Sequence, residues 1–142
     1  MPRSLGIDFG TRRIGLAISD PSGTISTPLP TLTRRAGKRA PVAAIAALAV
    51  EHEVVSIVIG LPLSLEGNET DWTAEVRAFG AKLAERTGVP VVYIDERLTS
   101  VVAEKTVRSL GLKRRERESK ERVDATAALL ILQTFLDRNP HV

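Results

Sequence analysis

The chain has no cysteine and only two histidines, His52 and His141. The absence of cysteine excludes disulfide bonds and thiolate metal sites. His52 falls near the end of an expected helix and His141 lies in the terminal tail, so a histidine-rich metal centre is not expected. Any metal site should therefore be built from oxygen ligands, which suit Mg²⁺ or Mn²⁺.

Aromatic residues are also scarce, at 4% of the chain, whereas hydrophobic residues make up 43%. The core must then be built from Val, Ile, Leu and Ala, as is typical of an α/β domain. A chain of 142 residues is expected to form one domain, residues 1–142, with a substantial core. The net charge of +3 allows a polyanionic partner without requiring one.

Long apolar runs are missing as well. No stretch reaches the roughly 20 apolar residues that a membrane-spanning helix needs. The opening Met-Pro-Arg-Ser lacks the apolar segment of a signal peptide. We therefore expect a cytoplasmic protein with no membrane partner.

The pattern of apolar residues and of Gly and Pro predicts the element order βββαβαβαα. Prolines 28 and 30 mark the third strand as an edge strand. Expected strands span residues 5–8, 14–19, 23–32, 54–59 and 91–94. The first expected helix spans 41–50, and the second runs from a cap at Thr70 or Asp71 to Gly88. The third runs from a cap at Thr99 or Ser100 to about residue 110, and the fourth spans 120–137. A loop is expected at 60–68 and a polar connector at 111–118. This order predicts a single mixed sheet of five strands with helices on both faces.

Three acidic residues occupy positions where a carboxylate is costly. Asp8 ends an apolar strand and shares a face with Ser4 and Gly6, Glu96 follows the last strand, and Asp124 lies on the apolar stripe of the last helix. A carboxylate removed from water must be paired with a cation or become protonated. If the three converge, they form a site for a divalent metal, which suggests metal-assisted phosphodiester chemistry.

Each acid also has an ordinary structural explanation. Asp8 could cap the following turn, Glu96 could pair with Arg97, and Asp124 could be a helix-start residue stabilised by the helix dipole. Asp95 has the opposite strand parity to Glu96, so we expect it to support the site rather than to bind the metal.

Basic residues that flank the acids are candidates for holding substrate phosphates. The nearest are Arg12, Arg13 and Arg97. A basic run that could extend this track consists of Arg34, Arg35, Lys38 and Arg39. A second run at 113–117 alternates with glutamates, so it could equally be a solvated helix start paired with itself.

Trp72, Phe79 and Tyr93 could be base-stacking platforms, but their spacing favours core packing. The loop at 60–68 is open to two interpretations. Its glycines suit a close approach of backbone to a ligand, and they also suit a plain turn between a strand and a helix.

Four segments together resemble the YqgF/RuvX family, a bacterial branch of the RNase H-like nuclease superfamily. They cover nearly the whole chain in order. The segments are Gly6-Ile7-Asp8-Phe9-Gly10-Thr11-Arg12-Arg13-Ile14-Gly15, Gly60-Leu61-Pro62-Leu63 with Gly67, Asp95-Glu96-Arg97-Leu98-Thr99-Ser100, and Lys120 with Val123-Asp124-Ala125 and the apolar helix that follows.

This resemblance implies an RNase H-like sheet of five strands and a metal-dependent nuclease. Members are described as nucleases that mature the 5′ end of pre-16S rRNA, and some as Holliday-junction resolvase-like. The catalytic acids of the family map by motif onto Asp8, Glu96 and Asp124. Two Mg²⁺ or Mn²⁺ ions would lie between them, with Asp8 shared and Glu96 and Asp124 each holding one side.

Rival classes of function remain open at this point. The segment from Gly6 to Thr11 also resembles the first phosphate loop of the actin and Hsp70 superfamily, although those enzymes use a second domain that this chain lacks. A nucleic-acid-binding module without catalysis is a second rival, and an adaptor in transcription or ribosome assembly is a third. The substrate could be an rRNA precursor or branched DNA, and the protein a monomer or a homodimer.

Overall fold

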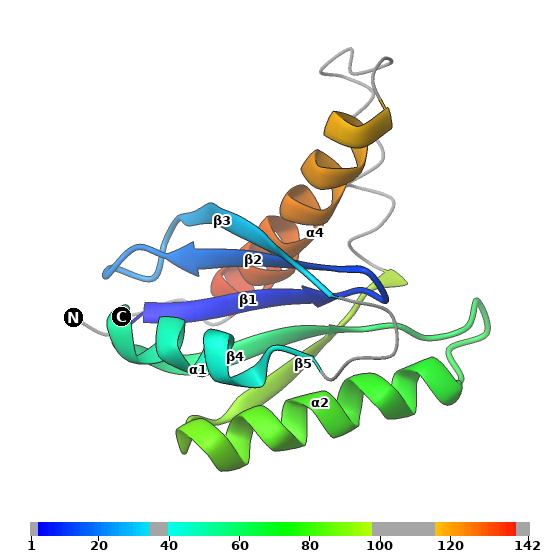
Figure 1. Ribbon diagram of the computed structural model, residues 1–142, viewed down its shortest axis with the longest axis horizontal. Helices are drawn as coiled ribbons and strands as arrows, with labels where there is room; N and C mark the ends of the chain where they lie inside the picture. The colour runs from blue at the N-terminus through cyan, green and yellow to red at the C-terminus, as the bar shows by residue number, and fades with distance from the viewer. Residues whose placement is uncertain (1–2, 35–39, 98–115, 139–142) are drawn as a thin grey trace.

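The computed structural model describes residues 3–34, 40–97 and 116–138, and within 116–125 only the backbone. Five strands form one sheet in the order β3-β2-β1-β4-β5 (Figure 1). The strands are β1 (Arg3–Phe9), β2 (Arg13–Ser19), β3 (Ser26–Thr33), β4 (Val54–Leu61) and β5 (Val91–Asp95), and the helices are α1 (Val42–Glu51), α2 (Asp71–Thr87) and α4 (Glu116–Arg138).

The sheet is mixed, as predicted, and β1 lies at its centre. β1 pairs with β2 in antiparallel fashion and with β4 in parallel, and β5 continues the parallel half. β3 is an edge strand, which confirms the expectation from its two prolines. Proline cannot donate a ladder hydrogen bond, so an edge tolerates it where a central strand would not.

The local signals at the ends of α2 account for its boundaries. Thr70 is the N-cap, and its hydroxyl accepts a hydrogen bond from the backbone N–H of Thr73, while the Thr73 hydroxyl accepts one from the N–H of Thr70. Gly88 ends the helix in a left-handed conformation with φ of 71°. The predicted cap and stop of this helix are both confirmed.

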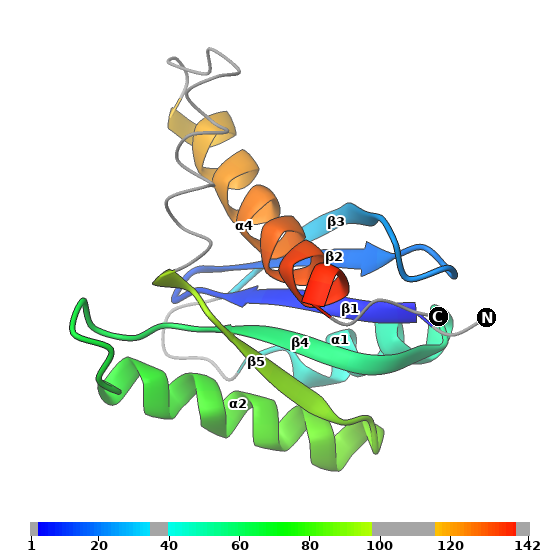
Figure 2. The same ribbon diagram turned by 180° about the vertical axis from the view of Figure 1, so that it is seen from behind.

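The two faces of the sheet are covered by different helices. Figures 1 and 2 show α4 crossing one face, and α1 and α2 lying side by side on the other. Odd-numbered residues of β1, such as Leu5 and Ile7, belong to the core beneath α1 and α2. Even-numbered residues face α4, where a Cβ on Gly6 would lie 2.6 Å from Cβ of Leu132. This parity places Asp8 on the α4 face.

Several predicted boundaries differ from the structure. Gly60 and Leu61 belong to β4 rather than to the loop, because both continue the parallel pairing with β5. The last helix begins at Glu116, so residues 116–118 are helical and not part of a connector. β3 begins at Ser26, since residues 20–25 form a turn held by Asp20. The expected helix near 99–110 lies outside the described residues. None of the described helices is long and apolar enough to cross a bilayer.

Candidate active site

Asp8 lies near the carboxyl end of the central strand, on the face that α4 covers. Its partner across the antiparallel pair with β2 is Gly15, which has no side chain. On the parallel side, Ile7 pairs with Ile59, so continuing this register by one residue sets Asp8 beside Gly60. Asp8 is half-buried and flanked by glycine on both neighbouring strands, so neither neighbour places a side chain directly beside its carboxylate.

Glu96 is held at the carboxyl end of β5 by its own backbone. Its N–H donates a hydrogen bond of 3.0 Å to the carbonyl oxygen of Leu61 in β4. Its side chain extends over Gly60, where an added Cβ would lie 2.6 Å from Oε1 and 2.7 Å from Cγ of Glu96. Such distances are too short for any real contact, so only glycine at position 60 permits this arrangement.

Gly60 thus occupies the gap between the two carboxylates. Asp8 lies on β1 and Glu96 follows β5, and β4 runs between these strands. Because residue 60 of β4 has no side chain, the two acids can reach each other across the strand. The sequence singled out this glycine only as part of a loop. Its position in the strand could have been found by extending the apolar run of β4 through Leu61.

The two carboxyl groups interact strongly. Burial raises the pKa of Glu96 most, and a hydrogen bond with Asp8 and the negative charges of Asp8 and Asp95 raise it further, to about 8. Two carboxylates in one site cannot both ionise cheaply, so the pair retains a proton near neutral pH. A divalent cation between them would take the place of that proton. Oxygen donors in this arrangement fit Mg²⁺ or Mn²⁺.

Asp124, the third predicted acid, belongs to α4, one helical turn before Ala128. Ala128 is buried against the sheet, and its carbonyl oxygen would lie 3.0 Å from a Cβ on Gly6. The side chain of Asp124 lies outside the described part of the structure, so the convergence of all three acids stays a prediction. Among the residues whose side chains are described, no three His, Cys, Asp or Glu are grouped to hold a metal.

Arg97 is exposed, but its guanidinium is held by contacts within the protein. Its guanidinium binds the carboxylate of Asp95, with Nη2 at 2.7 Å from Oδ2 and Nε at 3.1 Å from Oδ1. Its Nη1 donates a hydrogen bond of 3.3 Å to the carbonyl of Leu65. The hydrogen bond from Arg97 lowers the pKa of Asp95. Asp95 therefore supports the turn that carries Glu96, in agreement with its opposite parity.

The other predicted phosphate-binding residues fall into three groups. Arg12 is exposed in the turn after β1, and Arg13 begins β2 and is half-buried. Arg34 donates a hydrogen bond of 2.9 Å to the carbonyl of Gly10, and its guanidinium lies 4.5 Å from the ring centroid of Phe9. Arg34 thus stabilises the turn between β1 and β2. Arg35, Lys38 and Arg39 lie outside the described residues, as does the run at 113–115.

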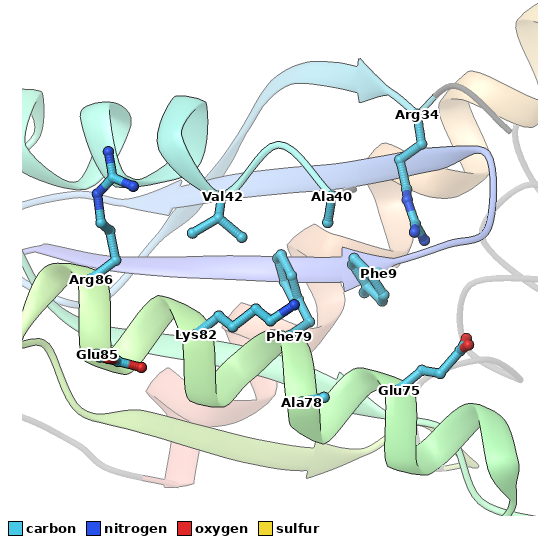
Figure 3. Close-up of a pocket in the computed structure, with 10 residues that line it drawn as sticks. All are labelled: Phe9, Arg34, Ala40, Val42, Glu75, Ala78, Phe79, Lys82, Glu85 and Arg86. Carbon is cyan, nitrogen blue, oxygen red and sulfur yellow. The ribbon is translucent and has the colours of Figure 1, made fainter. Parts of the chain in front are cut away.

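The aromatic residues pack in the core, as their spacing predicts. Phe9 stacks on Phe79 with ring centroids 4.0 Å apart and on Trp72 at 5.5 Å. Tyr93 is half-buried against the same cluster. Figure 3 shows Phe9 and Phe79 at the wall of a cavity of about 680 Å³, which Arg34, Lys82 and Arg86 also line. Asp8 and Glu96 do not line it, because they lie on the other face of the sheet.

Comparison with known proteins places this chain in a family. The chain matches the model of the family RuvX, described as Holliday junction resolvase, over residues 2–138. It is 44% identical over 136 residues to a protein of Koribacter versatilis, covering 96% of this chain and 87% of that one. It is 45% identical over 138 residues to a protein of Chloroflexus aggregans, covering 96% and 95%. Both relatives carry the name "Putative pre-16S rRNA nuclease".

Solved structures share the fold at low sequence identity. RuvC of T. thermophilus, in complex with a Holliday junction substrate, matches with a TM-score of 0.58 and 21% identity, covering 97% of this chain and 96% of RuvC. The Holliday junction resolvase of fowlpox virus matches with a TM-score of 0.56 and 7% identity, covering 96% and 99%. These likenesses confirm the RNase H-like fold. The family model and the two relatives show that the chain belongs to the RuvX family.

Proposed function

We propose that this protein is a divalent-metal-dependent nuclease that matures the 5′ end of pre-16S rRNA in the cytoplasm. The observation that carries the proposal is the pair formed by Asp8 and Glu96 across Gly60, in which Glu96 has a pKa of about 8. A fold gains no stability from two carboxylates crowded together at the ends of β1 and β5. Such an arrangement is typical of a metal site. The names of the relatives support the substrate.

Asp8, Glu96 and Asp124 would hold the metal, with Asp8 as the shared ligand because it lies on the central strand. When bound, one or two Mg²⁺ or Mn²⁺ ions would activate water and neutralise charge on the phosphodiester. The protein's own contribution is positional. β1 and the turn after β5 set the two described carboxylates in place, Gly60 lets them approach each other, and Gly15 leaves room for a substrate backbone beside Asp8.

Basic residues near the acids would hold the nucleic acid. Exposed Arg12 and half-buried Arg13 follow directly after β1 and are the best placed of the described cations. Arg97 and Arg34 are candidates only secondarily, since Arg97 pairs with Asp95 and Arg34 with the carbonyl of Gly10. The predicted track through Arg35, Lys38 and Arg39 would extend this surface. Neutralising Arg34, Arg35, Lys38 and Arg39 together is then expected to reduce the salt dependence of RNA binding.

A second candidate function is cleavage of four-way DNA junctions, which the description of the family model favours. The same metal chemistry would serve either substrate. Symmetric cleavage of a junction needs two active sites, so this function would require a homodimer, whereas trimming of rRNA would not. A protein that cut neither substrate would act in binding or assembly without turnover.

The test is cleavage of end-labelled nucleic acids by purified protein with Mg²⁺, with Mn²⁺ and with EDTA. The substrates are a 5′-extended pre-rRNA fragment, single-stranded DNA and a four-way junction. We expect metal-dependent cleavage of the RNA, and a loss of roughly a hundredfold or more in Asp8→Asn, as is found when one group central to transition-state stabilisation is removed. Asp71→Asn is the matched control, because Asp71 is exposed at the start of α2.

Each outcome decides between the candidates. Symmetric cutting of the junction alone would move the assignment to a resolvase. Wild-type cleavage by folded Asp8→Asn protein would contradict the assignment of the site. No metal-dependent cutting of any substrate would contradict the nuclease proposal and leave a binding or assembly role.

A further inference from the structure

Leu65 is an apolar side chain that the fold leaves in solvent. It lies in the loop that joins β4 to α2, and 92% of its surface is exposed. We propose that Leu65 packs against an unstacked nucleobase of the nucleic acid bound at the Asp8–Glu96 site. The inference rests on the proposed function and adds a contact that selects substrates with accessible bases.

The loop that carries Leu65 is ordered by its own hydrogen bonds. The N–H of Ser64 donates to the carbonyl of Asn68 at 2.9 Å, and the N–H of Gly67 donates to the carbonyl of Ser64 at 2.9 Å. The N–H of Asn68 donates to the hydroxyl of Ser64 at 3.0 Å. Gly67 has a φ of 86°, a conformation that other residues seldom adopt. These contacts close a compact turn with Leu65 and Glu66 at its tip.

Arg97 ties this turn to the acid site. It donates to the carbonyl of Leu65 and binds Asp95, the neighbour of Glu96. A Cβ on Gly67 would lie 3.0 Å from Nη1 of Arg97, so the guanidinium packs directly against the turn. The N–H of Glu96 also bonds to Leu61, just before the loop begins. The loop is thus linked to the Glu96 turn at two points, which fixes the place of Leu65 relative to that turn.

The chemistry of the tip favours a base over a phosphate. The carbonyl of Leu65 accepts a hydrogen bond from Arg97, and the side chain of Leu65 is aliphatic. Its neighbour Glu66 is exposed and negative, which disfavours a phosphate at the same point. The apolar surface that a nucleic acid offers is the face of a base, and it is available where bases are unpaired or unstacked. Apolar side chains of this kind are known to insert between base steps.

The experiment measures base environment and affinity together. A 5′-extended pre-rRNA fragment and a four-way DNA junction carry 2-aminopurine at successive positions, and each is titrated with Asp8→Asn protein in Mg²⁺. The fluorescence of 2-aminopurine rises when neighbouring bases no longer stack on it. We expect a rise at one or two adjacent positions. Leu65→Ser should abolish it and weaken binding roughly threefold to tenfold, as expected for part of the burial of one leucine side chain.

Two further variants control the result. Val50→Ser removes another apolar side chain, 79% exposed on α1, and should change neither the fluorescence nor the affinity. Leu65→Met keeps an apolar side chain of similar size and should retain most of the signal. Because Leu65 makes no core contact, the thermal midpoint should be the same in Leu65→Ser and in the parent protein.

Failure of this inference is distinguishable from failure of the nuclease proposal. If the protein cleaves but Leu65→Ser matches its parent in fluorescence and affinity, the base contact is wrong and the nuclease stands. If no cleavage occurs but the fluorescence depends on Leu65, the contact stands and the nuclease assignment fails. If neither probe binds, both are overturned.

Discussion

The same strands build both faces of the sheet, but the two faces serve different purposes. Beneath α1 and α2, β1 contributes Leu5, Ile7 and Phe9, which are all buried in a core of large side chains. Beneath α4, the same strand contributes Ser4, Gly6 and Asp8, which are small or charged. Because side chains alternate along a strand, the seven residues of β1 contribute in turn to one face and to the other.

The difference shows where this fold gains stability and where it gives stability up. Large apolar side chains buried on the first face supply most of the hydrophobic stabilisation. On the second face, β4 has glycine at position 60, and the gap it leaves brings two carboxylates together. Glycine in a strand packs nothing, and paired carboxylates repel, so this arrangement reduces stability in the absence of a cation. The contrast can be tested by perturbing each face separately.

The largest expected effect on stability comes from truncating a buried side chain on the face beneath α1 and α2. Phe79→Ala removes a ring that is 4% exposed and stacks on Phe9 at 4.0 Å. Loss of such a buried ring costs about 3–5 kcal/mol of unfolding free energy. Denaturant unfolding measures the loss, and Phe79→Leu should recover much of it. The fraction that remains folded should keep its metal affinity, and loss of that affinity would contradict the separation of the two faces.

A smaller effect on stability, with a larger one on function, is expected from Gly60→Ala. The added methyl would meet Cδ1 of Ile131 at 2.5 Å and Oε1 of Glu96 at 2.6 Å. Overpacking of this kind costs about 1–3 kcal/mol, and moving Glu96 away from Asp8 should weaken Mn²⁺ binding measured by calorimetry.

Gly88→Ala provides the matched control for Gly60→Ala. Its φ of 71° strains alanine, but nothing lies within 4 Å of the added methyl. It should lower stability by roughly 1 kcal/mol and leave metal binding intact. Equal loss of Mn²⁺ affinity in both variants would show that Gly60 acts through general stability alone.

A further expected effect is a pH dependence of the stability of the metal-free protein. The pKa of Glu96 rises from an ordinary 4.5 to about 8 on folding, so the folded state binds more protons than the unfolded state between these values. Unfolding free energy should therefore fall as pH rises through this window. Urea unfolding at pH 5 and pH 8 in EDTA measures the slope.

Asp8→Asn should reduce that slope only in part. Burial is the largest cause of the raised pKa, and it remains when the hydrogen bond and the charge of Asp8 are removed. Mg²⁺ or Mn²⁺ should also restore stability at pH 8 in the wild-type protein. A wild-type slope that equals that of Asp8→Asn would show that the two carboxyl groups are not coupled.

Local patterns were sufficient for much of the fold. Alternation placed Asp8 with Ser4 and Gly6, and proline marked β3 as an edge strand. The polar residues before Trp72 narrowed the cap of α2 to Thr70 or Asp71, of which Thr70 is the cap. Each signal depends on residues that are neighbours in the chain. For the same reason, the sequence could not show that Gly60 lies beneath Glu96, which follows 36 positions later in the chain.

The roles of the arginines were decided by contacts distant in sequence. Arg97 binds the turn around Leu65, and Arg34 binds the carbonyl of Gly10. Nothing in the local sequence distinguishes such an engaged guanidinium from a free one that binds phosphate. Asp8 and Glu96 were found from the sequence because a carboxylate at the end of an apolar strand is conspicuous there.

The sequence by itself determined the element order, the mixed sheet, the parity of Asp8 and the family, because periodicity, turn residues and motifs are properties of the chain. Only the tertiary structure decided that Asp8 and Glu96 meet across Gly60, that Arg97 holds the turn that exposes Leu65, and that the aromatic cluster lies on the opposite face. These features depend on strand order and on the absence of a side chain at one position. They arise when β4 is placed between β1 and β5.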